Sequence, residues 1–159
     1  MNTKSALFAL VLAALGTLAI ADTAPEHQIL ASGSAVKWGP APPSVPPGAK
    51  FAVIDGDPAG KGLVTVRLVM PAGYKIMPHW HPTDEHVTVL AGSLYLGMGD
   101  TLDTAHGKLL KVGGYAVAPA EMHHYAWTTA GATIQIHLMG PFAITYVNPA
   151  DDPRQSAKK

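Results

Sequence analysis

The sequence predicts an all-β fold in which antiparallel strands form a sandwich or a barrel. Short apolar runs recur from residue 51 onward, and Gly, Pro, Asp and Asn separate them. Within several runs apolar and polar residues alternate, as in a strand with one buried face. No window shows the sustained 3.6-residue period of an amphipathic helix. Many short strands joined by turns are typical of all-β sandwiches and barrels.

The strands are expected at regular intervals. In residues 63–70 every second side chain is Val, Leu or Met, which predicts one buried face. This face consists of Val64, Val66, Leu68 and Met70. A turn is expected at residues 91–93, around Gly92. The other strands are expected at residues 51–54, 87–90, 94–96, 109–112, 115–118, 124–128, 133–139 and 144–147.

The most informative segment contains two histidines and a glutamate. His79 and His81 are two residues apart, so on a strand their side chains lie on the same face. Glu85, four residues further on, has the same parity. Two imidazoles and a carboxylate supply most of a first coordination shell for a divalent transition metal. Without a cation, such buried polar groups would each cost about 1–3 kcal/mol. The sequence therefore predicts a metal site on a β-scaffold.

The same segment resembles the first motif of the cupin superfamily. The fixed positions of that motif fall on Gly73, His79, His81, Glu85 and Gly92. The resemblance implies a double-stranded β-helix, the cupin jelly-roll barrel.

A second cupin motif is matched with one departure. Gly113 and Pro119 occupy their places, but Glu121 replaces the usual glycine. By register the third histidine ligand of the family falls on His124, with His123 beside it as the alternative. The resemblance thus implies one mononuclear site of three histidines and one glutamate in each chain.

Further residues are candidates for the surroundings of the site. If Glu85 points inward, Val87 and Val89 do so too, which is consistent with a half-buried strand. Gln135 and His137 share one face of their strand. They either form an outward-facing polar pair or look into the barrel mouth, where they would support the metal ligands or contact a substrate. The remaining candidates for the pocket are Met70, Met77 and His123.

The first 21 residues have the features of a secretory signal peptide. Lys4 precedes an apolar run over residues 6–20, and the small-x-small sequence Ala19, Ile20, Ala21 closes it. The run is shorter than the roughly 20 residues of a membrane-spanning helix. We therefore expect cleavage after Ala21 and a secreted or periplasmic protein, with an uncleaved membrane anchor as the alternative.

The mature chain suits a single domain. We expect a Pro-rich N-terminal arm over residues 22–50, a cupin barrel over residues 51–150 and a C-terminal tail over residues 151–159. The arm is either a flexible linker or a segment that lies across the barrel or a neighbouring subunit, anchored by Trp38.

Composition excludes several classes of function. The full chain has 11 Lys and Arg, 11 Asp and Glu, and no cysteine. Without Lys4 the net charge is near −1, and no basic patch for nucleic acid is evident. The absence of cysteine excludes disulfides, a thiol nucleophile and zinc–thiolate sites.

The predicted site supports several functions. Three imidazoles and a carboxylate leave open positions for substrate, water or dioxygen. The resemblance includes oxalate oxidases and quercetin dioxygenases, so we expect a metal-dependent oxidoreductase acting on a small molecule. Glu85 would then be a ligand and a catalytic base. A non-catalytic binding cupin and a metal-dependent isomerase or lyase are the alternatives. The ligands do not select among copper, manganese, iron, zinc and nickel. We expect no nucleic-acid partner and no membrane partner after cleavage of the signal peptide, and a homodimer remains open.

Overall fold

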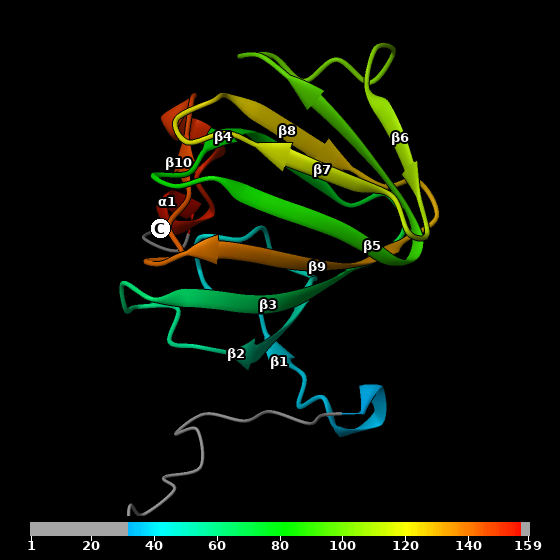
Figure 1. Cartoon of the computed structure of the whole chain (residues 1–159). Helices are drawn as coiled ribbons and strands as arrows, with labels where there is room; N and C mark the ends of the chain where they lie inside the picture. The colour runs from blue at the N-terminus through cyan, green and yellow to red at the C-terminus, as the bar shows by residue number, and fades with distance from the viewer. Residues whose placement is uncertain (1–31, 157–159) are drawn as a thin grey trace, which may run out of the picture. The chain divides into compact units, whose positions relative to one another are not determined.

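The structure is a computed structural model that describes residues 32–156, and it is almost entirely β (Figure 1). The predicted signal peptide and its cleavage site lie outside the described residues, as do residues 157–159. In the described part, no helix has the length and apolar character needed to cross a membrane.

Ten strands of the described chain form one antiparallel sheet that curls on itself. They are β1 (Gly39–Pro40), β2 (Lys50–Asp55), β3 (Leu63–Met70), β4 (Lys75–Trp80), β5 (Glu85–Met98), β6 (Lys108–Lys111), β7 (Tyr115–Ala118), β8 (His124–Trp127), β9 (Ala132–Met139) and β10 (Thr145–Tyr146). The helical elements of this part are short: η1 (Gly33–Ala35), η2 (Pro149–Asp151) and α1 (Pro153–Ser156). The all-β jelly roll expected from the sequence is confirmed.

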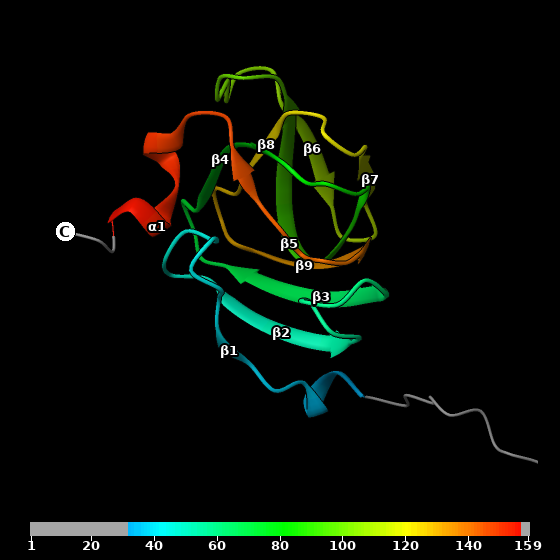
Figure 2. The ribbon, with the colours of Figure 1, turned by 90° about the vertical axis from the view of Figure 1, so that its left-hand side faces the viewer.

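The curled sheet has two layers, which we call sheet A and sheet B. Sheet A contains β1, β2, β3, β9, β7 and the first half of β5. Sheet B contains β6, β8, β4, β10 and the second half of β5. The view in Figure 2 shows the two layers enclosing the interior of the barrel.

Strand β5 passes from one layer to the other without a turn. The turn expected at residues 91–93 is therefore wrong. The register shifts between Val89 and Ala91, as in a β-bulge, and Gly92 has a φ of +70°. The Cβ of any larger residue at Gly92 would lie 2.1 Å from the carbonyl oxygen of Gly131. The bulge and this glycine bend the strand, so that one element belongs to both layers.

The core lies between the layers. The expected inward face of β3 is buried, with Val64 and Val66 completely inaccessible to solvent. These residues pair with Leu138 and Ile136 of β9, whose side chains are buried on the same face. Burial of this apolar surface, at about 25 cal/mol per Å², is the main force that holds the layers together.

The proline-rich segment before β2 packs on its own barrel. Val45 belongs to the buried core. The hydroxyl groups of Tyr74 and Tyr146 donate hydrogen bonds to the carbonyl oxygens of Pro46 and Ser44. Trp38, the expected anchor, is 40% exposed. Residues 39–49 are thus held by their backbone and by Val45.

Candidate metal centre

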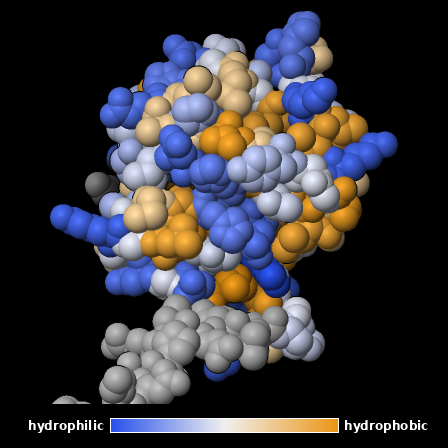
Figure 3. All heavy atoms as spheres, viewed as in Figure 1, coloured by the Kyte–Doolittle hydropathy of each residue, from blue (hydrophilic) through white to orange (hydrophobic). Residues whose placement is uncertain are grey.

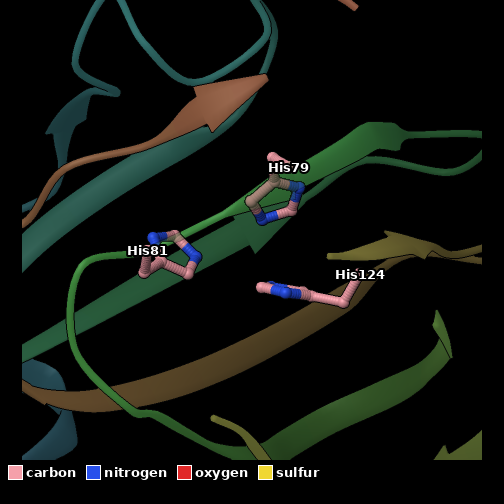
Figure 4. A group of neighbouring side chains, drawn as sticks. All are labelled: His79, His81 and His124. Carbon is pink, nitrogen blue, oxygen red and sulfur yellow. The ribbon is translucent and has the colours of Figure 1, made fainter. Parts of the chain in front are cut away.

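Three histidines converge inside the barrel, as Figure 4 shows. One ring nitrogen from each of His79, His81 and His124 lies within 4.8 Å of the other two. The ring centroids are separated by 5.0 Å for His79–His81, 4.3 Å for His79–His124 and 5.2 Å for His81–His124. All three side chains are at most 3% exposed. These nitrogens are close enough together to bind one metal ion.

Sheet B places these histidines. His79 is near the end of β4, and it pairs directly with His124, the first residue of β8. Side chains of paired residues in an antiparallel ladder lie on the same face, here the inner one. His81 directly follows β4 and keeps the parity of His79. The His-x-His spacing thus becomes two neighbouring inward imidazoles.

The main chain fixes the tautomer of each imidazole. The Nδ1 atoms of His79, His81 and His124 lie 2.7, 2.7 and 2.9 Å from the carbonyl oxygens of Met77, Ala143 and Met122. A carbonyl only accepts, so each Nδ1 carries the proton and each Nε2 keeps a free lone pair. This is the arrangement by which proteins orient histidine ligands of metals.

Two of these lone pairs have no partner in the described part of the protein. The Nε2 atoms of His81 and His124 are buried and make no hydrogen bond. A buried polar atom without a partner costs about 1–3 kcal/mol. A cation at the centre of the cluster would satisfy both atoms, and the site therefore fits a metal ion.

Glu85 lies beside the histidines at the start of β5. Its Oε1 is 3.5 Å from Nε2 of His81, and its Oε2 is 3.5 Å from Nε2 of His124. Burial alone would raise the pKa of Glu85, but the neighbouring histidines outweigh it and lower the pKa to about 2. Glu85 is thus an ionised carboxylate inside the barrel, which a cation would also stabilise.

The histidines differ in their affinity for protons. Burial, reinforced by His124 and His81, lowers the pKa of His79 to about 3. Burial also acts to lower the pKa of His124, but the interaction with Glu85 prevails and raises it. His79 is therefore neutral, whereas His124 takes up a proton more readily than His79 because Glu85 stabilises its charged form.

A small cavity borders the cluster. It measures about 30 Å³ and is lined by His79, Glu85 and His124. Aliphatic side chains such as Val87, Leu96 and Ile136 form the remaining wall. A water molecule needs about 10–15 Å³, so the cavity has room for two or three waters. An exchangeable ligand has this much room beside the proposed metal.

The structure separates the two adjacent histidines of the second motif. His124 is 1% exposed and faces His79 and His81. The Nδ1 atom of His123 instead lies 2.6 Å from Oδ1 of Asp100, at the surface. Only His124 lies with the other two histidines.

The other pocket candidates lie elsewhere. Met70 is 1% exposed in the core but does not line the cavity. Met77 packs against the core and supplies only its carbonyl oxygen, to His79. Gln135 and His137 form the outward-facing pair, which is one of the two expected arrangements. Ile134 and Ile136 of the same strand face the cavity instead.

On the outer face of sheet A this pair belongs to a polar network. Arg67 Nε donates a hydrogen bond of 2.9 Å to Gln135 Oε1, and Thr65 Oγ1 lies 3.0 Å from Nδ1 of His137. Figure 3 shows hydrophilic side chains gathered over the middle of the molecule, where Figure 1 has β3, β5 and β9. This face is suited to water rather than to a second layer.

Glu121 adopts a backbone conformation that favours glycine. Its φ is +61°, and its N–H donates a hydrogen bond of 2.8 Å to the carbonyl oxygen of His81. This hydrogen bond ties the loop before β8 to the His-x-His segment. A non-glycine residue at such a φ costs about 1–2 kcal/mol.

Sequence reasoning missed the segment that closes the site from the far end of the chain. The ring of Phe142 lies 6.2 Å from that of His81, and the ring of Tyr146 lies 5.9 Å from that of His79. Nothing in the sequence pairs these residues with the motif, although the aromatic residues just before and within β10 are a weak signal of packing.

The curled antiparallel sheet, with histidines converging inside it at β4 and β8, has the fold of solved cupin structures. The chain belongs to the family described as "Domain of unknown function (DUF4437)", whose model matches residues 26–145. No curated protein sequence matches the chain.

Several solved structures share the fold at low sequence identity. The polyketide cyclase RemF from Streptomyces resistomycificus is 15% identical, with a TM-score of 0.62, over 84% of this chain and 94% of that chain. A proposed acetylacetone dioxygenase from Methylibium petroleiphilum PM1 is 19% identical, with a TM-score of 0.61, over 82% and 88%. The DMSP lyase DddQ from Ruegeria pomeroyi DSS-3 is 20% identical, with a TM-score of 0.56, over 72% and 62%. One fold thus carries several reactions.

Proposed function

We propose that this protein binds one divalent transition metal through His79, His81, His124 and Glu85, and that it is a metal-dependent oxidoreductase of the oxidase or dioxygenase type. The observation that carries the proposal is the convergence of three imidazoles whose Nδ1 protons are all held by main-chain carbonyls. Their free Nε2 atoms form a preorganised donor set. The dioxygenase among the structural neighbours supports the reaction class by analogy of fold.

A metal bound here would act as a Lewis acid and offer open coordination positions. The chain's own residues have separate roles. The three imidazoles hold the ion, and the aliphatic wall of the cavity excludes bulk water. Glu85 completes the donor set. Its carboxylate, with a pKa near 2, is ionised at neutral pH, which suits a metal ligand and makes it a weak base, so the role of catalytic base expected from the sequence is not part of this proposal.

The setting of the reaction is part of the proposal. We propose that the protein is exported, that it acts on a small molecule and that it has no nucleic-acid partner. Imidazole and carboxylate ligands bind copper most tightly among the five metals considered, and manganese and iron least tightly. The absence of cysteine is compatible with an oxidising compartment.

Two measurements, made one after the other, test the proposed function. Metal analysis of the purified protein is expected to find about one transition-metal ion per chain, and His79→Ala is expected to abolish it. His106→Ala is the matched control, because the His106 side chain is 83% exposed and lies on a loop. A wild-type protein that binds none of the five metals contradicts the proposed site.

Oxygen uptake then tests the reaction class. The metal-loaded protein is expected to consume dioxygen when small-molecule substrates are screened in an oxygen electrode, and His79→Ala is not. Substrate conversion without oxygen uptake would instead assign an isomerase or lyase, the class suggested by the DMSP lyase neighbour. Binding without any conversion would assign a non-catalytic cupin.

A further inference from the structure

A second and much larger cavity lies beside the metal centre, between the free edges of the two layers. In the described chain β6 and β7 each pair only with β5, β6 in sheet B and β7 in sheet A. Between them is an open groove of about 800 Å³. A volume of 300–1,000 Å³ is typical of sites for small organic ligands. We call this cavity the β6–β7 groove.

The floor of the β6–β7 groove is one side-chain layer from the metal ligands. Leu96 lines both the groove and the small cavity beside the histidines. Met98, which also lines the groove, pairs directly with His124 in the β5–β8 ladder. A ligand in the groove therefore lies against the two residues that separate it from the proposed metal.

The wall of the groove is apolar, and its rim is charged. Leu96, Met98, Leu110 and Ala116 supply apolar surface. At the rim, Asp100 and Asp103 are already engaged, each 2.6 Å from a ring nitrogen of His123 or His106. These contacts occupy one oxygen of each carboxylate, and the hydrogen bond from His106 lowers the pKa of Asp103, so this carboxylate stays ionised.

Lys108 is a positively charged residue in the wall of the groove. It pairs with Leu96 in the β5–β6 ladder, so its side chain is on the face of sheet B that Leu96 presents to the interior. It is exposed, and it forms no ion pair with any described residue. A charged residue on the inner face of a strand at a sheet edge also protects that edge against association. Lys108 therefore either binds an acidic group of a ligand or only protects the sheet edge, and these two roles make different predictions for ligand binding.

We propose that the β6–β7 groove binds a small amphipathic molecule with an apolar body and one acidic group. The body lies on Leu96, Met98 and Leu110, and the acidic group pairs with Lys108. That this ligand is the substrate of the metal centre rests on the function proposed above, whereas the binding itself does not.

Two matched fluorescent probes test the binding. Anilinonaphthalene sulfonate has an apolar body with an anionic group, and phenylnaphthylamine has a similar body without the charge. Both are expected to bind wild-type protein at one site. Lys108→Gln is expected to weaken the sulfonate by about fivefold and to leave the uncharged probe unchanged. Lys111→Gln is the control, since Lys111 is three residues further along the same strand and so on its opposite face.

Filling the groove tests its location. Ala116→Trp is expected to abolish binding of both probes, because Ala116 lines the groove. Val117→Trp, on the opposite face of β7, is expected to leave both affinities unchanged. The proposal is overturned if Lys108→Gln changes the affinity for the sulfonate less than twofold, or if Ala116→Trp still binds the probes as the wild type does.

Nuclear relaxation separates this inference from the proposed metal function. Protons of bound anilinonaphthalene sulfonate are expected to relax faster in Cu²⁺-loaded than in Zn²⁺-loaded protein, because the paramagnetic ion lies just beyond Leu96. Equal relaxation in the two loaded forms would refute a groove beside the metal. A protein that takes up neither ion but discriminates the probes as described would refute the metal function and leave the groove standing.

Discussion

Each histidine of the candidate metal centre is oriented by a main-chain carbonyl and not by another side chain. The acceptors belong to Met77, Ala143 and Met122, so substitution of those side chains leaves the hydrogen bonds in place. The path of the backbone therefore sets the orientation of the three imidazoles. Local backbone shifts would change this orientation, whereas most substitutions at the three acceptor positions would not.

The two adjacent histidines of the second motif allow a matched pair of variants. His124→Ala is expected to lower metal content from about one ion per chain to a small fraction, because it removes one of three converging nitrogens. His123→Ala, which removes a surface contact to Asp100, is expected to retain the metal. Metal analysis after gel filtration measures both. Equal metal loss in the two variants would contradict the assignment of His124.

Metal affinity is expected to fall with acidity. Glu85 raises the pKa of His124 in the metal-free protein, so a proton competes with the metal for this ring. Below that raised pKa, each unit of pH is expected to weaken apparent zinc affinity by about tenfold, corresponding to one displaced proton. Chelator competition between pH 8 and pH 5 measures the slope. Affinity independent of pH over this range would show that no ligand is protonated.

Relief of backbone strain at Glu121 is expected to stabilise the protein. Glu121→Gly removes a left-handed φ in a side-chain-bearing residue and adds entropy to the unfolded chain, for a net gain of about 0.5–1 kcal/mol. Urea unfolding measures the difference. Glu121→Ala keeps the strain and is the control, expected to be near neutral. A destabilised Glu121→Gly protein would mean that the carboxylate itself makes a necessary contact.

At the scale of elements, β5 determines the architecture. The strand carries Glu85 at one end and Met98, opposite His124, at the other. It pairs with β7 and β9 in sheet A and with β6 and β8 in sheet B. Its bend at the bulge therefore sets how the layers face each other across the metal centre.

The bend can be tested with two glycines of similar conformation. Gly92→Ala is expected to cost about 3 kcal/mol, because a left-handed φ is combined with a Cβ only 2.1 Å from the oxygen of Gly131. Gly73→Ala has a similar φ of +76° but no atom within 4 Å of the new Cβ, so about 1 kcal/mol is expected. Thermal or urea unfolding compares them. Equal losses of stability in the two variants would mean that a small backbone shift relieves the close approach at Gly92.

Strand parity was predictable from the sequence, and the path of the chain was not. Alternation identified the buried face of β3 because every second residue is apolar. The same reasoning expected a turn at Gly92, since a glycine between two apolar runs has the same local signal whether the chain turns or bulges. The direction of Gln135 and His137 depended on which face of β9 is turned toward the core, and the structure shows that it is the face of Ile134 and Ile136.

For the whole molecule, the metal is expected to be a structural ligand as well as a cofactor. At a free metal concentration of 100 times the Kd, binding to the folded state alone adds about 2.7 kcal/mol of stability. For a domain of this size that corresponds to roughly 10 °C in Tm. Scanning calorimetry of chelator-treated and zinc-reloaded protein measures the shift. His79→Ala is expected to show none, and an unchanged wild-type Tm would contradict tight binding.

The cupin fold and the residues of its motifs were accessible from sequence because short-range spacing encodes them. The surroundings of the site were not. Ala143 and Phe142 reach His81 from more than 60 positions away. The β6–β7 groove arises where two strand edges separate, which depends on long-range pairing. Such features have no signature within a local window.

If the protein acts on a small molecule as proposed, the small size of the cavity beside the histidines limits which part of that molecule can react. With room for two or three waters, the cavity would admit a single functional group, and Leu96 would have to move aside for the body of the molecule to lie in the groove. Regioselectivity would then follow from steric depth alone: terminal positions of an elongated compound would be modified, and internal ones would be spared.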